Sequence, residues 1–325
     1  MIIEILSTGS VSPNGVGKIG SPEKCPEISL VGSNATHPVA LVDKNAPEIL
    51  KWSKEPRLRR ASPISYYLIE AANQALAPFP DLDRTRIGVV VAFFLGCVDY
   101  SVKFYRQITT DGRRYGSPIL FPETVFNTPI SHVVATLGIE GPVYSQIGDK
   151  SGWVTALRTA ECWMKNGSAD HVIVLGAEEF DPHVLDALHA SRLLKKGLPF
   201  AEGAGAVLLS SKGNGSSVKL ASAKDGYCFA NRSEAIETAV ACLSNAPQSA
   251  PILSTSNGWN ANVENFTATG REWLFDKKLN CEAFTASAAW ETIRGIQLIQ
   301  ELQLTNLVIP HWGITQQSGA IHLVR

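Results

Sequence analysis

The chain alternates short runs of apolar, β-branched residues with longer segments whose apolar positions recur at helical spacing. Several runs, such as Ile87–Phe94, carry no polar side chain, which is typical of strands covered on both faces. This alternation predicts βαβ units and a parallel or mixed sheet. The expected strands are Ile2–Leu6, Ile87–Phe94, Val143–Ile147, His171–Ala177, Gly205–Ser210, Val218–Ala223, Ile252–Thr255, Leu307–Pro310 and Ile321–Val324. The expected helices are Ser65–Ala77, Val98–Thr110, Glu123–Leu137, Ser151–Asn166, Pro182–Lys195, Ser233–Ser244 and Thr285–Leu302.

One strand–turn–helix–strand unit has its turn at 146–152. Asp149 or Ser151 can cap the helix that follows, and Gly167 can supply the left-handed residue that ends it. A turn at a helix N-terminus points backbone N–H groups at whatever occupies it. This turn is therefore a favoured place for a reactive centre.

Composition excludes several classes of function. The net charge of -1 leaves no basic excess to hold nucleic acid. No apolar stretch reaches the length of a membrane span, and the N-terminus does not read as a signal peptide. The six cysteines are scattered, with no CxxC pair and no histidine at zinc spacing. We therefore expect a cytoplasmic protein with free thiols, no metal and no cofactor.

Several motifs resemble the β-ketoacyl synthase family. The segment 117–145 resembles the part of that family before its active-site cysteine, and 151–179 resembles the nucleophile helix with its following strand. The stretch PFAEGAGAVLL at 199–209 resembles a characteristic strand entry of the family, whereas 281–296 and 311–324 match less well. The resemblance implies an α/β, thiolase-like fold of five layers (αβαβα) with two similar halves. We expect an N-terminal half at 1–211 and a shortened C-terminal half at 212–325, divided at KGNGSS.

The resemblance also places the family's catalytic triad. A ketosynthase needs a thiolate at a helix N-terminus and two imidazoles. Aligned on the family motifs, Asp149 falls on the cysteine, while Asn257 and Glu282 fall on the two histidines. The glycine-rich turn of the last hairpin reads Gly-Ile-Thr-Gln at 313–316. The chain therefore resembles chain-length factors, the non-catalytic partners of ketosynthases, and we expect an inactive homologue of this acyltransferase family.

The same resemblance implies the partners. We expect a heterodimer with an active β-ketoacyl-ACP synthase that shares the edge strand near Val143–Ile147, with acyl carrier protein as a second partner docking mostly on the active subunit. The pathway would be fatty acid, aryl polyene or polyketide biosynthesis. The helix expected at Glu123–Leu137 would help to set acyl chain length, and the residues expected to line a pocket or tunnel are Phe121, Phe126, Lys150, His311 and Ile314.

Each of these residues has a plainer interpretation. Asp149 can be an ordinary helix cap, and Phe121 and Phe126 can be core residues. Lys150 can pair with Glu282 and so plug the former pocket. Cys97 and Cys281 are expected to be buried small apolar residues, and His311 is the histidine nearest to the former centre.

Two alternatives of a different class stay open at this point. The chain can be an enzyme with altered chemistry, such as an acyl thioester decarboxylase, hydrolase or acyltransferase that uses Asp149, Lys150 or His311. It can also be a homodimeric protein that binds acyl chains.

Overall fold

The computed structural model describes residues 3–325 except 32–33, 195–196, 214, 229–233, 235–237, 240, 243, 255–269 and 316. Its strands are β1 (Ile3–Ser12), β2 (Gly15–Val16), β3 (Glu27–Ser29), β4 (Thr36–Ala40), β5 (Ile87–Phe93), β6 (Val143–Ile147), β7 (His171–Glu178), β8 (Phe200–Ala201), β9 (Gly203–Ser210), β10 (Lys219–Cys228), β11 (Ile252–Leu253), β12 (Trp273–Leu274), β13 (Asn306–Trp312) and β14 (Gln317–Val324). Its helices are α1 (Pro47–Lys54), α2 (Pro63–Leu76), α3 (Val98–Thr110), α4 (Asn127–Leu137), α5 (Gly152–Lys165), α6 (Pro182–Ala190) and α8 (Phe284–Glu301), with short 3-10 turns η1 (Arg84–Arg86), η2 (Arg113–Tyr115), η3 (Phe121–Thr124) and η5 (Lys277–Leu279).

The strands form one continuous mixed path in the order β12-β11-β13-β14-β10-β1-β9-β7-β5-β6. In the first half, β5 runs parallel to both β6 and β7, and β9 runs antiparallel to β7 and β1. In the second half, the hairpin β13–β14 lies beside β10. The two halves meet at β1 and β10, which pair only at Ile3↔Leu220 and Glu4↔Lys219. The expected division at 211/212 falls between β9 and β10 and stays a prediction.

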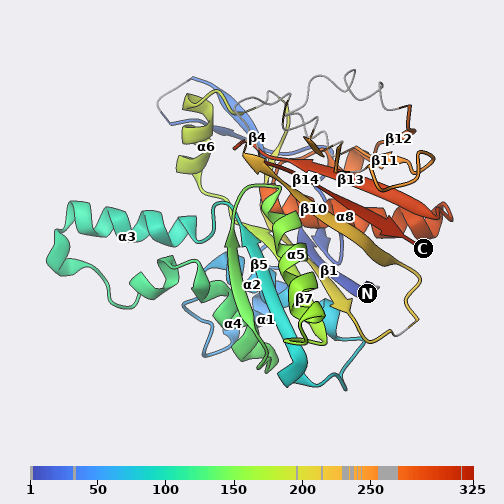
Figure 1. The fold of residues 1–325 in the computed structure, drawn as a ribbon. Helices are drawn as coiled ribbons and strands as arrows, with labels where there is room; N and C mark the ends of the chain where they lie inside the picture. Colours follow the sequence, from blue (N-terminus) through green and yellow to red (C-terminus); the bar gives the residue numbers. More distant parts are fainter. Residues whose placement is uncertain are drawn as a thin grey trace.

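Helices separate these two parts of the sheet into layers (Figure 1). Helices α5 and α8 lie between them, in a core that holds Trp153 and Trp290 together with apolar residues of β7, β9, β13 and β14. Helices α1, α2 and α4 cover the other face of the first half, where Ile64, Leu68 and Val133 are buried against β5 and β7. This is the order of helix, sheet, helix and sheet that the family resemblance implies.

The helix expected at Ser233–Ser244 lies half outside the described residues. The described part of it contributes buried Ala239, which packs against Trp312 of β13. Cys242 packs in a neighbouring cluster with Ile252 and Val308. These two described residues therefore lie against strands of the second half.

Some element boundaries differ from those predicted. The first strand runs on to Ser12, because Gly9 has no side chain to collide with the carbonyl of Ala71 on α2. The helix expected from Glu123 is instead the turn η3 followed by α4, since Val125 between them is extended. Helix α6 ends at Ala190, ahead of Arg192 with a φ of 57°.

A three-stranded sheet has no counterpart in the predicted elements, whereas the helix expected at Val98–Thr110 is confirmed at the same bounds as α3. This small sheet, β3-β4-β8, lies beside the main one. Helix α3 and the turns η2 and η3 form an arm, residues 98–125, that extends away from the body (Figure 1). None of the residues of α3 is buried, although its polar and apolar positions are segregated as in an amphipathic helix.

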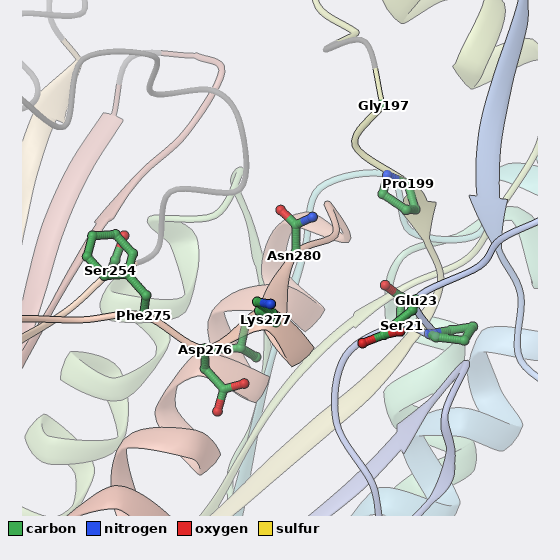
Figure 2. A pocket seen from close by; sticks show the side chains of 11 residues that line it. Ser21, Glu23, Gly197, Pro199, Ser254, Phe275, Asp276, Lys277 and Asn280 are labelled. Carbon is green, nitrogen blue, oxygen red and sulfur yellow. The ribbon is translucent and has the colours of Figure 1, made fainter.

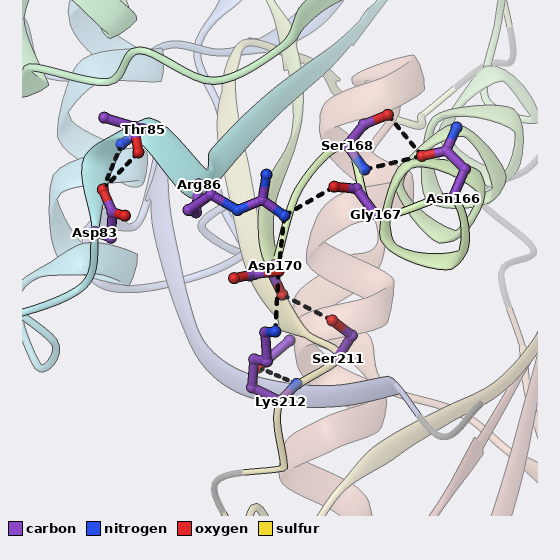
Figure 3. A network of polar contacts seen from close by, with 10 residues as sticks. Asp83, Thr85, Arg86, Asn166, Gly167, Ser168, Asp170, Ser211 and Lys212 are labelled. Carbon is purple, nitrogen blue, oxygen red and sulfur yellow. Dashed lines mark hydrogen bonds and ion pairs between the residues drawn. The ribbon is translucent and has the colours of Figure 1, made fainter.

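The far end of the first half is held by an ion pair network (Figure 3). The guanidinium group of Arg86, at the start of β5, lies 3.0 Å from the carboxylate of Asp170, just before β7. It also donates a hydrogen bond of 2.8 Å to the backbone carbonyl of Gly167. Lys212, just after β9, lies 3.3 Å from the same carboxylate. These side chains fix the register of three neighbouring strands at the end remote from the Asp149 turn.

The opposite end of β7 carries two buried glutamates that join four elements. Glu178 accepts hydrogen bonds from the backbone of Phe94 and Leu95 and from the hydroxyl of Thr285 on α8. Glu179 accepts from Asp99 N at 2.9 Å, at the start of α3, and from Ile64 N at 3.4 Å, at the start of α2. Burial raises the pKa of Glu178 to about 7 and that of Glu179 to about 8, although these hydrogen bonds oppose the shift.

These shifts predict a stability that falls as the pH rises. Because the folded-state pKa of each group lies above its ordinary value, the stabilisation is complete at low pH and is lost as the pH rises through about 7 and about 8. Urea unfolding measured between pH 6 and pH 9 should show that the free energy of unfolding decreases by on the order of 2 kcal/mol. Glu179→Gln should flatten this dependence, whereas the exposed Glu55→Gln should leave it unchanged. An unchanged slope in Glu179→Gln would contradict the assignment.

Candidate functional site: the Asp149 turn

The turn between β6 and α5 places Asp149 and Lys150 at the centre of the fold. Asp149 is only 1% exposed. Its carboxylate accepts hydrogen bonds from Thr315 N at 2.8 Å and from the Thr315 hydroxyl. It also accepts from Ser151 N at 3.2 Å. The expected capping role is therefore fulfilled differently, because the carboxylate closes the turn ahead of α5 and ties it to the last hairpin.

The hairpin turn packs directly on this carboxylate. A Cβ atom at Gly313 would occupy the space of the Asp149 carboxylate, so only glycine fits there. Thr315 then directs both its N–H and its hydroxyl at the same oxygen. The side chain that the family alignment places on the nucleophile is thus a hydrogen-bond acceptor that holds two loops together.

Lys150 lies in a buried chain of charged groups. Its ammonium group forms an ion pair with Glu291 on α8, and both side chains are almost fully buried. The other oxygen of Glu291 lies 3.1 Å from Nδ1 of His311 on β13, an electrostatic contact without hydrogen-bond geometry. Burial lowers the pKa of His311, against the opposing effect of Glu291. The imidazole is consequently neutral near pH 7, and one lysine balances one glutamate.

Glu282 lies at the entrance to α8, beside this chain of charges. Its carboxylate accepts from Phe284 N at 2.7 Å, and its backbone pairs with the segment 199–201. Burial raises the pKa of Glu282 to about 7, and the positive charge of Lys150 opposes that shift. The ion pair that the structure resolves for Lys150 is thus with Glu291, whereas Glu282 contributes to its surroundings.

Aromatic side chains fill the space next to Glu282. Phe284 has a φ of 41°, which is unusual for a residue with a side chain. Its ring lies 4.6 Å from that of Phe94 and 5.7 Å from that of Phe200, measured between centroids. Ile314 from the hairpin turn packs into the same cluster. Ile314 is therefore part of a packed apolar region next to the Asp149 turn.

The other expected site residues lie further away or outside the description. Phe121 is exposed on the arm and contacts Phe104, while Phe126 packs on Phe93 below the arm. Asn257 falls outside the described residues. Cys97 and Cys281 are buried, and burial raises the pKa of each thiol to about 12, as expected of inert core cysteines. Phe121 and Phe126 thus pack against residues other than those of the Asp149 turn.

A surface pocket of about 480 Å³ opens outside Glu282 (Figure 2). Its lining includes Pro199, Ser254, Phe275 and Asn280, on the segments that flank Glu282 and the undescribed residues 255–269. This pocket is lined from both expected halves, since Glu23 and Pro199 precede residue 212, whereas Phe275 and Asn280 follow it.

Sequence reasoning missed two residues of this site, Glu291 and Thr315. Glu291 stands among small and apolar residues of α8, in the stretch ASAAWETI, and a lone charge on such a face can be read as a buried pairing partner. Thr315 gives no such signal, because its role depends on how the last hairpin folds back over Asp149.

The comparisons with known proteins agree with this geometry. The family model of 3-oxoacyl-(acyl-carrier-protein) synthase III matches residues 149–226. A β-ketoacyl synthase from Burkholderia phymatum superposes with a TM-score of 0.80 at 14% identity, over 100% of this chain and 99% of that chain. The chain has the ketosynthase fold. The resemblance that its motifs carry is thereby confirmed, as is the thiolase-like α/β class.

Two further structures have the same fold. The ishigamide ketosynthase/chain length factor superposes with a TM-score of 0.77 at 16% identity, over 100% of this chain and 99% of that chain. A type II polyketide synthase acyl carrier protein in complex with its ketosynthase gives 0.75 at 14% identity, over 99% of both chains. Comparison with curated protein sequences finds no match. None of the described helices is long and apolar enough to cross a bilayer.

The buried pair predicts an asymmetric response to mutation. Glu291→Leu alone leaves the Lys150 ammonium buried without its partner, and should cost about 3–5 kcal/mol of unfolding free energy. The double variant Lys150→Met/Glu291→Leu removes both charges and should recover most of that loss in urea unfolding. The exposed pair Glu161–Lys165 on α5 is the control, where Glu161→Leu should change stability by less than about 1 kcal/mol. Equal losses in the single and double variants would contradict the pairing.

Proposed function

We propose that this protein is a non-catalytic, chain-length-factor-like subunit that pairs with an active β-ketoacyl-ACP synthase. The observation that carries the proposal is the state of Asp149. Its carboxylate is buried and engaged by Thr315 and Ser151, at the position where the family alignment puts the nucleophile. A carboxylate held in this way has no free lone pair directed at a substrate, and it forms no thioester.

The open edge of the sheet supports a partner of similar fold. Strand β6 is the last strand on its side and pairs only with β5 among the described strands. Its sequence, VYSQI, carries no charge, and Tyr144 and Ile147 are 49% and 58% exposed. An uncharged apolar edge of this kind is what monomeric proteins avoid. Pairing with the equivalent strand of a ketosynthase would cover it.

The neighbouring arm adds apolar surface on the same side of the molecule. Tyr105, Tyr115, Ile119 and Phe121 are exposed there, and Phe121 belongs to the set expected to line a tunnel or a dimer contact. In this proposal the arm and the first turns of α4 contact the partner, and there they help to set acyl chain length.

The comparisons suggest the setting. One similar structure is described as a ketosynthase/chain length factor and another as a ketosynthase with its acyl carrier protein. By analogy, the second partner of this chain would be acyl carrier protein, in fatty acid, aryl polyene or polyketide biosynthesis in the cytoplasm.

Co-expression with a ketosynthase encoded nearby tests the catalytic part of the proposal. We expect a stoichiometric heterodimer whose condensing activity is lost when the partner's cysteine is replaced, and persists in Asp149→Asn of this chain. The asparagine keeps an acceptor for Thr315 while removing the charge. A homodimer that turns over malonyl or acyl thioesters by itself, and loses that activity in Asp149→Asn, would establish the alternative of an enzyme with altered chemistry.

The edge strand gives a separate prediction. Ile147→Lys places a charge on the open edge, so the complex with the ketosynthase should dissociate at least about tenfold more readily. Analytical ultracentrifugation of the co-purified proteins measures this change. Val31→Lys is the matched control, because Val31 is also exposed but lies outside β6 and the arm. Equal behaviour of the two variants would show that β6 is not the interface.

A further inference from the structure

A groove with two lobes lies between the N-terminal loop 14–23 and the segment 275–280, away from β6 and the arm. The first lobe is the pocket of about 480 Å³ with Pro199, Ser254, Phe275 and Asn280 in its lining. The second lobe, of about 500 Å³, is lined by Asn14, Lys18, Lys278 and Gln297. Both lobes share Ser21, Pro22, Glu23 and Lys277 in their linings, so they adjoin at these residues. Each lobe has the volume of a small-molecule site.

The second lobe is positively charged. Lys18, Lys277 and Lys278 line it against a single carboxylate, Glu23. Within the described residues, none of these three ammonium groups forms an ion pair with a side chain. Lysine clusters without protein counter-ions attract multiply charged anions such as phosphates. The lobe therefore suits an oligophosphate better than a single carboxylate.

The first lobe offers a flat apolar surface beside neutral polar groups. Phe275 is 64% exposed, and it lies on the opposite side of the pocket from Glu23, with Lys277 and Asn280 between them (Figure 2). An exposed aromatic ring next to hydrogen-bonding groups such as the Asn280 amide is suited to stacking a planar heterocycle. Phosphates on the lysines and a ring on Phe275 would place the two parts of one ligand in adjacent lobes.

The walls of the groove are fixed before any ligand binds. Gly20 has a φ of 77° and no side chain, so the backbone there packs directly against the carbonyl of Lys278. The backbone N–H of Ser21 donates a hydrogen bond of 3.3 Å to the same carbonyl. On the other wall, Asp276 accepts from Lys278 N at 2.9 Å and forms an ion pair with Arg294 of α8. These contacts hold η5, and hence both adjacent lysines, against the N-terminal loop.

We propose that this groove binds a nucleotide-like ligand, with its phosphates at Lys18, Lys277 and Lys278 and its ring on Phe275. The site is separate from the Asp149 turn and from the β6 edge, so it does not depend on the role proposed for those parts.

Calorimetric titration of the full chain with ADP, pyrophosphate and adenosine tests the site. ADP should bind more tightly than either fragment. The double variant Lys277→Ala/Lys278→Ala should bind ADP and pyrophosphate roughly tenfold more weakly, or weaker still. Phe275→Leu should weaken ADP and adenosine by about fivefold or more, and leave pyrophosphate unchanged. Lys54→Ala, an exposed lysine on α1 remote from the groove, is the matched control and should change nothing.

Three results would overturn the proposal. One is the absence of ADP binding at millimolar concentration by a chain whose circular dichroism is that of the folded protein. Another is an equal weakening by Lys54→Ala, which would mean non-specific attraction of anions. The third is ADP affinity that is insensitive to Phe275→Leu, which would reduce the site to one for phosphate alone. None of these outcomes bears on heterodimer formation, so failure here is distinguishable from failure of the subunit role.

Discussion

The buried ion pair between Lys150 and Glu291 constrains the rest of the site. It joins the turn before α5 to the third turn of α8, two elements that meet only in the middle layer of the fold. Two charges in that position are costly to desolvate, so neither is tolerated without the other. His311 stays neutral beside them because burial lowers its pKa, against the opposing effect of Glu291. The centre of the molecule is thereby a balanced electrostatic cluster, and an acyl group entering there would have to separate it.

The engaged Asp149 turn at the centre and the unpaired edge of β6 at the surface both fit a subunit that acts through a partner. Asp149 and Gly313 bring the last hairpin down on the turn, so the place of a nucleophile is occupied by contacts internal to the chain. The uncharged strand β6 and helix α3 of the arm lie on the surface of the first half, where no described strand pairs with the outer edge of β6 and no residue of α3 is buried. Apolar structure that is unfavourable in a monomer is concentrated at the surface, whereas the Asp149 carboxylate at the centre is engaged by hydrogen bonds from its own chain. This distribution is what a subunit acting through a partner would have.

Much of the fold was predictable from the sequence, because its strands are continuous apolar runs. The strand Val143–Ile147 was located at its observed ends, and the helix after it to within a residue at either end. The failures have local causes. The extended backbone at Val125 divides one expected helix, and the small sheet β3-β4-β8 is built from strands too short to give a pattern. The arm was predicted as a helix, but its position away from the core cannot be inferred from helical spacing.

The site was less predictable than the fold, for a physical reason. Aligned motifs identify Asp149 and Glu282 as positions of interest, but not their partners, since those come from α8 and the last hairpin. Neither Glu291 nor Thr315 belongs to an aligned motif. In the structure, however, Glu291 supplies the counter-charge for buried Lys150, and Thr315 supplies hydrogen bonds to buried Asp149. A substituted active site is therefore better judged by the groups that satisfy the new side chains than by the loss of the old ones. A lost nucleophile alone leaves open whether chemistry persists, whereas a replacement held by four hydrogen bonds from its own chain has acquired a structural task.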